Sequence, residues 1–170
     1  LHRPRHSFPT RRSSDLGEMY FNLGTHPAFM ASEFPVTDYY LEFSEPETLD
    51  LYTLVGLTVA KETKPFLKNE KVIKITEDLF KDDALVFKGH KSEYLSLKNV
   101  NNSEEVKVSL KDFTWLGIWA PPGAPFVCLE PWCGVADMED HNGDLTKKEA
   151  VNKLEKGGSF KRVMEIIVNK

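Results

Sequence analysis

An acidic side chain lies within an otherwise apolar run at residues 126–132. With the two-residue period of a β-strand, one face of this run carries the side chains of Phe126, Cys128, Glu130 and Trp132. The other face carries Val127, Leu129 and Pro131. Neither face is a polar, solvated one, so we predict that Glu130 points into a pocket. A carboxyl group among apolar groups is poorly solvated, which raises its pKa toward the range useful for a general base. The structural alternative is a carboxylate bonded to a buried Trp or to a backbone amide.

A second candidate for proton transfer is His26, which follows Gly24-Thr25 and precedes Pro27. The proline favours extended backbone at His26, so the ring is predicted to sit on a short segment between strand and loop. An imidazole gains or loses its proton near neutral pH and can serve as an acid or a base. Position alone also allows a core or loop histidine with one satisfied hydrogen bond. The catalytic interpretation requires that His26 and Glu130 face a shared cleft.

Residues 1–16 differ from the rest of the chain in composition and show no periodicity. Back-translated, residues 6–16 resemble the in-frame translation of a common sequencing adapter, although an Arg-rich and Ser-containing transit peptide would share this composition. We predict that residues 1–16 are non-native and disordered, and we leave them out of the reasoning about the fold. On this interpretation residues 17–170 are the C-terminal part of a domain, and the chain is a fragment of a longer protein.

Charge and composition exclude several classes of protein. The 170 residues carry a net charge of −4, and without the four Arg and one Asp of residues 1–16 the remainder carries 18 basic and 25 acidic residues, or −7. An acidic domain without a basic stripe is an unlikely partner for nucleic acid. No run of about eighteen apolar residues is present, so no membrane span is predicted. Cys128 and Cys133 would face opposite ways on a strand, which disfavours a disulfide and favours a cytoplasmic location.

The pattern along residues 17–170 is typical of an all-β protein. Short apolar or alternating runs are separated by turn-forming clusters at the spacing of a large antiparallel β-sandwich. The runs cover residues 20–23, 39–43, 49–54, 71–76, 84–87, 94–97, 106–110, 126–129 and 160–168. We expect one short helix over residues 146–156, because Thr146 and Glu149 form a capping-box pattern and two glycines follow.

Three segments resemble, in order, motifs of the aldose 1-epimerase (galactose mutarotase-like) family. They are residues 21–29 (Phe-Asn-Leu-Gly-Thr-His-Pro-Ala-Phe), residues 80–87 (Phe-Lys-Asp-Asp-Ala-Leu-Val-Phe) and residues 116–137, which include Glu-Pro-Trp-Cys-Gly-Val-Ala-Asp. The resemblance covers most of residues 19–168 and is closest to bacterial members. It implies a large antiparallel sandwich, incomplete here at its N-terminus, that interconverts the α and β anomers of a free aldose without a cofactor.

The resemblance also implies roles for individual residues. His26 matches the general acid, Glu130 matches the general base, and Asp83 matches a carboxylate that accepts hydrogen bonds from sugar hydroxyls. Trp119 and Trp132 could offer the sugar an apolar surface, although large aromatics in a sandwich also serve as core, and Asp83 could equally be a solvated turn acid. Family members carry an Arg and often another His in a part of the chain that has no counterpart here, so the fragment itself could be inactive.

Three alternatives to a free-sugar epimerase follow from the same residues. A hexose 6-phosphate epimerase is disfavoured because Arg162 is the one Arg after position 16, and phosphate recognition usually draws on Arg. A non-catalytic sugar-binding sandwich would use the same three residues, His26, Asp83 and Glu130, only as hydrogen-bonding groups. A metal hydrolase is disfavoured because no closely spaced His and carboxylate ligands occur in the sequence, and we predict no metal site. The sequence does not indicate the oligomeric state.

Overall fold

The computed structural model describes residues 5–13, 17–31 and 35–169, and for residues 5–13 it describes the backbone only. All pairings between the named strands are antiparallel, so the all-β prediction is confirmed. None of the helices in the described residues has the length and apolar character that a membrane crossing would require.

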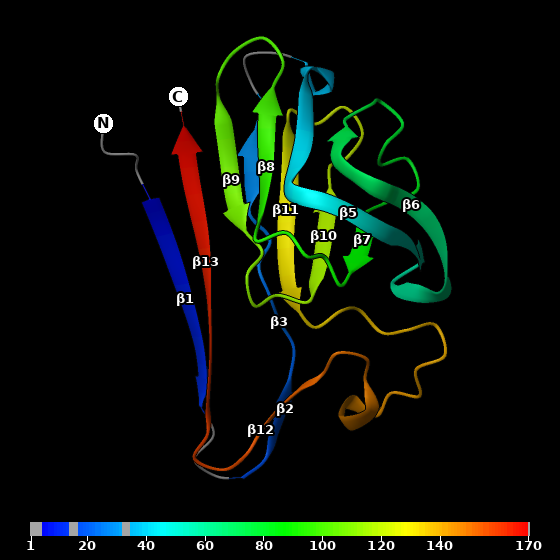
Figure 1. The fold of residues 1–170 in the computed structure, drawn as a ribbon. Helices are drawn as coiled ribbons and strands as arrows, with labels where there is room; N and C mark the ends of the chain where they lie inside the picture. Colours follow the sequence, from blue (N-terminus) through cyan, green and yellow to red (C-terminus); the bar gives the residue numbers. More distant parts are fainter. Residues whose placement is uncertain (1–4, 14–16, 32–34, 170) are drawn as a thin grey trace.

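Eleven strands form one large curled sheet in the order β1-β13-β9-β8-β5-β7-β10-β11-β3, with β4 beside β11 and β6 beside β5 (Figure 1). Their bounds are β1 Arg5–Ser13, β3 Leu23–Gly24, β4 Ala28–Met30, β5 Tyr39–Val55, β6 Thr58–Lys74, β7 Leu85–Lys88, β8 Tyr94–Asn99, β9 Glu105–Ser109, β10 Trp115–Trp119, β11 Phe126–Cys133 and β13 Ser159–Asn169. A second sheet pairs β2 (Met19–Phe21) with β12 (Asn152–Leu154). Two 3₁₀ turns, η1 (Val36–Asp38) and η2 (Leu145–Lys147), complete the elements.

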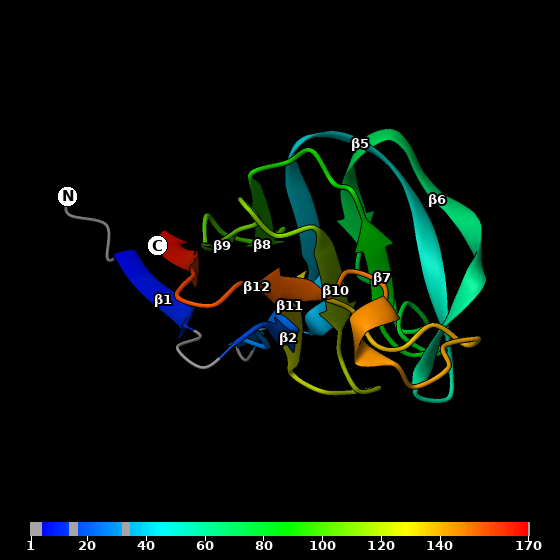
Figure 2. The same ribbon diagram turned by 90° about the horizontal axis from the view of Figure 1, so that it is seen from below.

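The β5–β6 hairpin bends away from the rest of the sheet (Figures 1 and 2). Each of its strands has 17 residues, and their register shifts at several points between Glu42 and Leu54. Such bulges bend a strand and increase its twist, which accounts for the curvature. Among the described strands β6 pairs only with β5, and an edge position of this kind tolerates Pro65 because the side of the strand without a neighbour requires no N–H donor.

Strands β10 and β11 are buried on both faces. Leu116, Ile118, Val127 and Leu129 belong to a large apolar cluster on one face. Trp115 belongs to a smaller cluster on the other face, with Val59, Val86 and Val135, and Trp132 packs against it. The alternation predicted for residues 126–132 is therefore confirmed, and it explains why neither face of β11 is polar.

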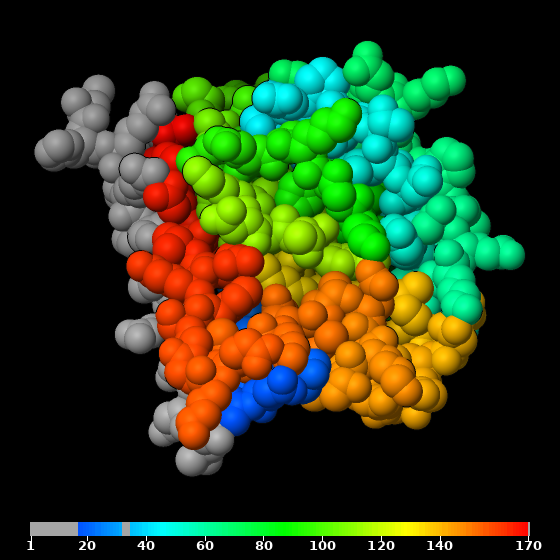
Figure 3. All heavy atoms as spheres, turned by 60° about the horizontal axis from the view of Figure 1, so that its bottom comes forward, coloured from blue at the N-terminus to red at the C-terminus, as the bar shows by residue number. Residues whose placement is uncertain are grey.

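The predicted helix over residues 146–156 is wrong. The structure has only the η2 turn, followed by Lys148 in extended backbone, Ala150 at φ 57°, and strand β12. The turn is capped by Asp144, whose carboxylate accepts from Thr146 N at 3.0 Å, so the Thr-Glu pattern does not act as a capping box. Tertiary contacts override the local helical preference, because Lys148 pairs with Asp137 and the Asn152 amide bonds to Cys133 O at 2.7 Å. Figure 3 shows residues 140–158 (orange) packed beside residues 17–22 (blue).

Residues 5–13 form strand β1, where the sequence analysis predicts disorder. They pair with β13 from Arg5 opposite Ile167 to Ser13 opposite Ser159. Strand β13 otherwise has β9 as its neighbour in the sheet, and its outer edge carries backbone groups that need partners. Antiparallel pairing satisfies those groups. That residues 1–16 are non-native stays a prediction.

Candidate active site

Backbone pairing brings His26 and Glu130 into one row across the sheet. On β11, Trp132 lies opposite Gly24 of β3, and Cys128 lies opposite Ala28 of β4. Between these pairs, Thr25 N donates to Pro131 O at 3.2 Å and Leu129 N donates to Pro27 O at 3.1 Å. The two neighbours of His26 in the sequence are thus hydrogen-bonded through their backbones to the two neighbours of Glu130. This fixes the imidazole beside the carboxylate on the same face.

The two side chains are in contact, but they differ sharply in exposure. His26 Nε2 lies 3.3 Å from Glu130 Oε1, and the side chains are 62% and 5% exposed, respectively. The imidazole is therefore open to a solute, whereas the carboxylate is almost wholly buried. Burial raises the pKa of Glu130 above its ordinary value, while the charge of His26 and a hydrogen bond from the Trp132 side chain oppose that rise. The pKa of the carboxyl group therefore lies closer to the range of a general base, as the sequence context of Glu130 predicts.

Two glycines make room for Trp132 beside Glu130. A Cβ atom at Gly24 would lie 2.6 Å from Trp132 Cδ1, and one at Gly117 would lie under 3.0 Å from Cζ2 and Cη2. Gly117 is also the residue opposite Glu130 on β10. The indole therefore spans from β3 across β11 to β10, and it occupies the space that a larger residue at 117 would take. In this position the indole N–H donates to the Glu130 carboxylate.

Trp119 is the second tryptophan of the site and lies beside His26. It is half-buried, and its ring centroid is 6.4 Å from that of the imidazole with the planes at 83°, an edge-to-face arrangement. Its partner across the strands is Cys128, which shares the face of Glu130. His26, Glu130, Trp119 and Trp132 are thus brought together, as the sequence analysis predicts for a shared site.

Asp83 is not brought into contact with this group in any described interaction. It is exposed at φ 82°, just before β7, and its carboxylate accepts from Ala84 N at 2.7 Å. Leu85 pairs with Ile118, so Asp83 lies beyond the Trp119 end of β10. A role for Asp83 in binding stays a prediction.

Cys128 was not among the predicted site residues, yet the structure places it beside both of them. The sulfur, the His26 ring nitrogen and a Glu130 oxygen all lie within 4.8 Å of one another. Burial, and secondarily the charge of Glu130, raises the pKa of the Cys128 thiol to about 11. The signal in the sequence was the two-residue spacing that puts Cys128 and Glu130 on one face.

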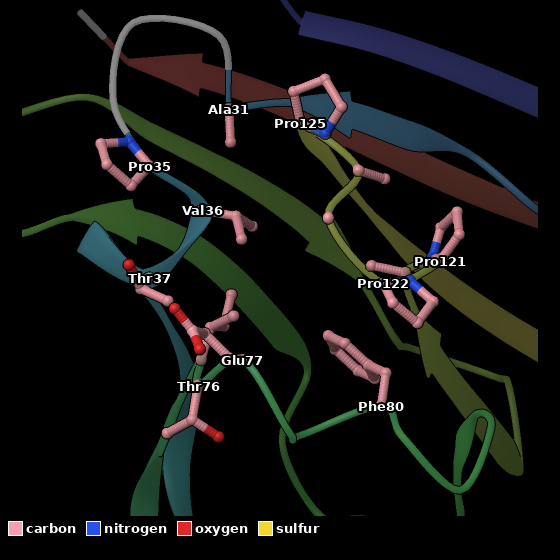
Figure 4. A pocket seen from close by; sticks show the side chains of 14 residues that line it. Ala31, Pro35, Val36, Thr37, Thr76, Glu77, Phe80, Pro121, Pro122 and Pro125 are labelled. Atoms are coloured by element: carbon pink, nitrogen blue, oxygen red, sulfur yellow. The ribbon is translucent and has the colours of Figure 1, made fainter.

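A cavity of about 520 Å³ lies at the loop end of β10 and β11, away from these residues. Its wall is largely apolar, and four of the residues that line it, Ala31, Ile75, Phe80 and Ala120, belong to the large core cluster. Figure 4 shows Ala31 and Phe80 among the lining side chains. Neither His26 nor Glu130 lines any of the described cavities. The pocket predicted around Glu130 is not one of these cavities, and the carboxylate lies buried on the sheet face that also carries Cys128.

Comparisons with known proteins agree with this architecture. No protein-family model matches the chain. It superposes on the galactose mutarotase related enzyme from Lactobacillus acidophilus with a TM-score of 0.84 and 28% identity, over 98% of this chain and 57% of that one. It superposes on a galactose mutarotase-like protein from Lactobacillus casei with a TM-score of 0.84 and 19% identity, over 97% and 58% of the two chains. The fold is that of the galactose mutarotase-like proteins, and the resemblance to the aldose 1-epimerase family is confirmed.

A curated relative is the plasmid form of protein LacX from Lactococcus lactis subsp. lactis. The two sequences are 31% identical over 143 residues, which covers 80% of this chain and 48% of LacX. The chain therefore spans about half the length of the curated relatives that it matches.

Proposed function

We propose that the protein containing this chain interconverts the α and β anomers of a free aldose by general acid–base catalysis. The observation that carries this proposal is the contact between an exposed imidazole and a buried carboxyl group, 3.3 Å apart. The ring oxygen and the anomeric hydroxyl of an aldose are bonded to the same carbon. An acid and a base that act on these two oxygens must therefore lie close together, as His26 and Glu130 do.

In the proposed reaction, Glu130 takes the proton from the anomeric hydroxyl while His26 donates a proton to the ring oxygen. The bond between the anomeric carbon and the ring oxygen breaks, which leaves an open-chain aldehyde. Rotation about the C1–C2 bond presents the other carbonyl face to the same hydroxyl. On reclosure His26 takes a proton back and Glu130 returns one, so the protons balance and no cofactor is needed.

The surroundings of the pair support these roles. The raised pKa of Glu130 suits a base that must also return its proton, and the hydrogen bond from Trp132 holds the carboxylate in one orientation. Trp119 stands beside the imidazole, where an apolar sugar face could lie against it. We assign Asp83 to hydroxyl binding in the complete protein.

A free sugar suits this part of the chain better than a phosphorylated one. Arg162 is the one Arg after residue 16, and its guanidinium already donates to Asp112 O at 2.7 Å and to Lys161 O at 2.9 Å. It also stacks on Phe160 with 4.0 Å to the ring centroid. These contacts hold Arg162 on β13 and leave it poorly suited to a bidentate phosphate contact.

The proposal is tested by magnetisation-exchange NMR of glucose and galactose with the full-length protein. We expect faster anomer exchange than in buffer, and loss of that acceleration in Glu130→Gln while sugar binding persists. Glu47→Gln is the matched control, because Glu47 is a second buried carboxylate whose Oε1 accepts from two backbone amides and whose role is structural. An unchanged rate in Glu130→Gln would remove Glu130 from the mechanism. Binding without acceleration by the unmodified protein would instead indicate a non-catalytic sugar-binding sandwich.

A further inference from the structure

The side chains of His26, Cys128 and Glu130 together offer the donor set of a zinc ion. Their ligand atoms lie within 4.8 Å of one another. Zinc binds thiolate sulfur at about 2.3 Å and imidazole or carboxylate at about 2.0–2.2 Å, so donor atoms around a tetrahedral ion are about 3.3–3.6 Å apart. His26 Nε2 and Glu130 Oε1, at 3.3 Å, already have that separation. The Cys128 sulfur, within 4.8 Å of both, would complete the set on approaching them.

The backbone holds these three groups in place. Cys128 and Glu130 are two residues apart on one face of β11, whose backbone pairs with β10 on one side and with β3 and β4 on the other. His26 is fixed by the backbone bonds of Thr25 and Pro27 to the same strand. The two β11 groups are buried, whereas the imidazole is exposed and can meet an ion from solvent.

We propose that His26, Cys128 and Glu130 form a binding site for Zn²⁺ or a similar thiophilic divalent cation, with water as the fourth ligand. On binding, the thiol proton of Cys128 leaves to solvent, and the thiolate and the carboxylate balance the two positive charges of the ion. The donor set of one sulfur, one nitrogen and one oxygen favours zinc over magnesium or calcium, which prefer oxygen ligands.

Occupation of this site would inhibit the reaction proposed above, a consequence that rests on the proposed function. The ion would coordinate the ring nitrogen of His26 and the carboxylate of Glu130. Neither group could then give or accept a proton, so the reaction would lose both its acid and its base. Binding of the metal itself does not depend on any activity, so the two proposals can be tested separately.

Co²⁺ serves as the probe for the site, because cobalt in a tetrahedral site with a thiolate ligand gives visible d–d bands and a near-ultraviolet sulfur-to-metal absorption. We expect the chain to give this spectrum, stoichiometric Zn²⁺ to abolish it, and Cys128→Ser to lack the sulfur absorption. Removal of an outer-sphere partner lowers metal affinity about 10–100-fold, so loss of a ligand in Cys128→Ser or His26→Asn should weaken Zn²⁺ binding at least about 100-fold.

Cys133→Ser is the matched control, since Cys133 is also free and buried but belongs to the cluster on the opposite face of β11. It should bind Zn²⁺ and Co²⁺ as the unmodified chain does. A cobalt spectrum without the sulfur absorption, or Zn²⁺ affinity that is the same in Cys128→Ser, would overturn the proposed site. Zinc binding by a protein that shows no anomer exchange would leave the site standing and refute only the proposed function.

Discussion

The position of Trp132 can be tested through the two glycines beneath it. Neither glycine has a positive φ, so an alanine is compatible with the backbone at both positions, and only the indole stands in its way. At Gly117 the added Cβ would lie under 3.0 Å from Cζ2 and Cη2, where ordinary contact begins at 3.4 Å. We expect Gly117→Ala to lower the free energy of unfolding by about 1–3 kcal/mol, as overpacking does in other cores.

The substitution Trp132→Phe separates the two glycines. A phenyl ring lacks the outer part of the indole that reaches Gly117, but it keeps the Cδ1 atom that meets Gly24. In the Trp132→Phe background, Gly117→Ala should therefore be neutral or stabilising, by up to about 1 kcal/mol, because alanine restricts the unfolded chain. Gly24→Ala should remain destabilising in both backgrounds.

Urea unfolding followed by circular dichroism measures the effect of each glycine substitution in the unmodified chain and in the Trp132→Phe variant, which gives two double-mutant cycles. The expected coupling between positions 117 and 132 is about 1–4 kcal/mol, whereas that between 24 and 132 should be small. Equal effects of Gly117→Ala in the unmodified chain and in the Trp132→Phe variant would show that the indole does not lie over Gly117. The orientation assigned to Glu130 through Trp132 would then also be wrong.

Two further predictions concern the buried groups of the site. Because burial raises the pKa of Glu130, the folded chain holds this proton more tightly than the unfolded chain does. The associated stability is present below the ordinary pKa of 4.5 and is lost as pH rises through the folded pKa. Glu130→Gln should therefore become more stable relative to the unmodified chain between pH 4 and pH 8. The gain should be about 1.4 kcal/mol for each unit by which the folded state raises the pKa of Glu130. Urea midpoints across this range measure the difference, and parallel pH profiles would contradict it. Cys128, whose pKa is raised to about 11, should react with a disulfide reagent at pH 8 far more slowly in the folded chain than in urea, and labelling at the same rate in both would show that the thiol is accessible.

Much of the fold follows from local patterns in the sequence. The alternation in residues 126–132 places Glu130 and Cys128 on one face, and the structure agrees. The runs at residues 39–43 and 49–54 are strands, but they belong to the single long strand β5, because the polar residues between them continue the pairing through bulges. Most of β6 was not predicted, since its many Lys and Glu residues and Pro65 conceal the strand pattern of an exposed edge.

The candidate site depends on pairings that residue patterns do not specify. His26 and Glu130 are 104 positions apart in the sequence, and only the register of β3 and β4 on β11 brings them together. The residue types predict that the two could face a shared cleft, and the family resemblance implies the same pair, but neither specifies this register. The prediction of no metal site rests on spacing along the chain. Spacing cannot reveal that His26 lies beside Cys128 and Glu130 of a strand about a hundred residues away. The failed helix has a similar cause, because Lys148 and Asn152 are drawn into contacts with Asp137 and Cys133.

The central claim is that His26 and Glu130 act together on one sugar. It is tested most directly by anomer-exchange rates of the full-length protein with His26→Asn, Glu130→Gln and both substitutions. Each single variant should lose about 10²–10⁴-fold in rate, and the double variant should lose little more than the worse single one, because one missing partner already disables the proton exchange. Losses that multiply in the double variant, or a single variant that keeps the full rate, would contradict the account.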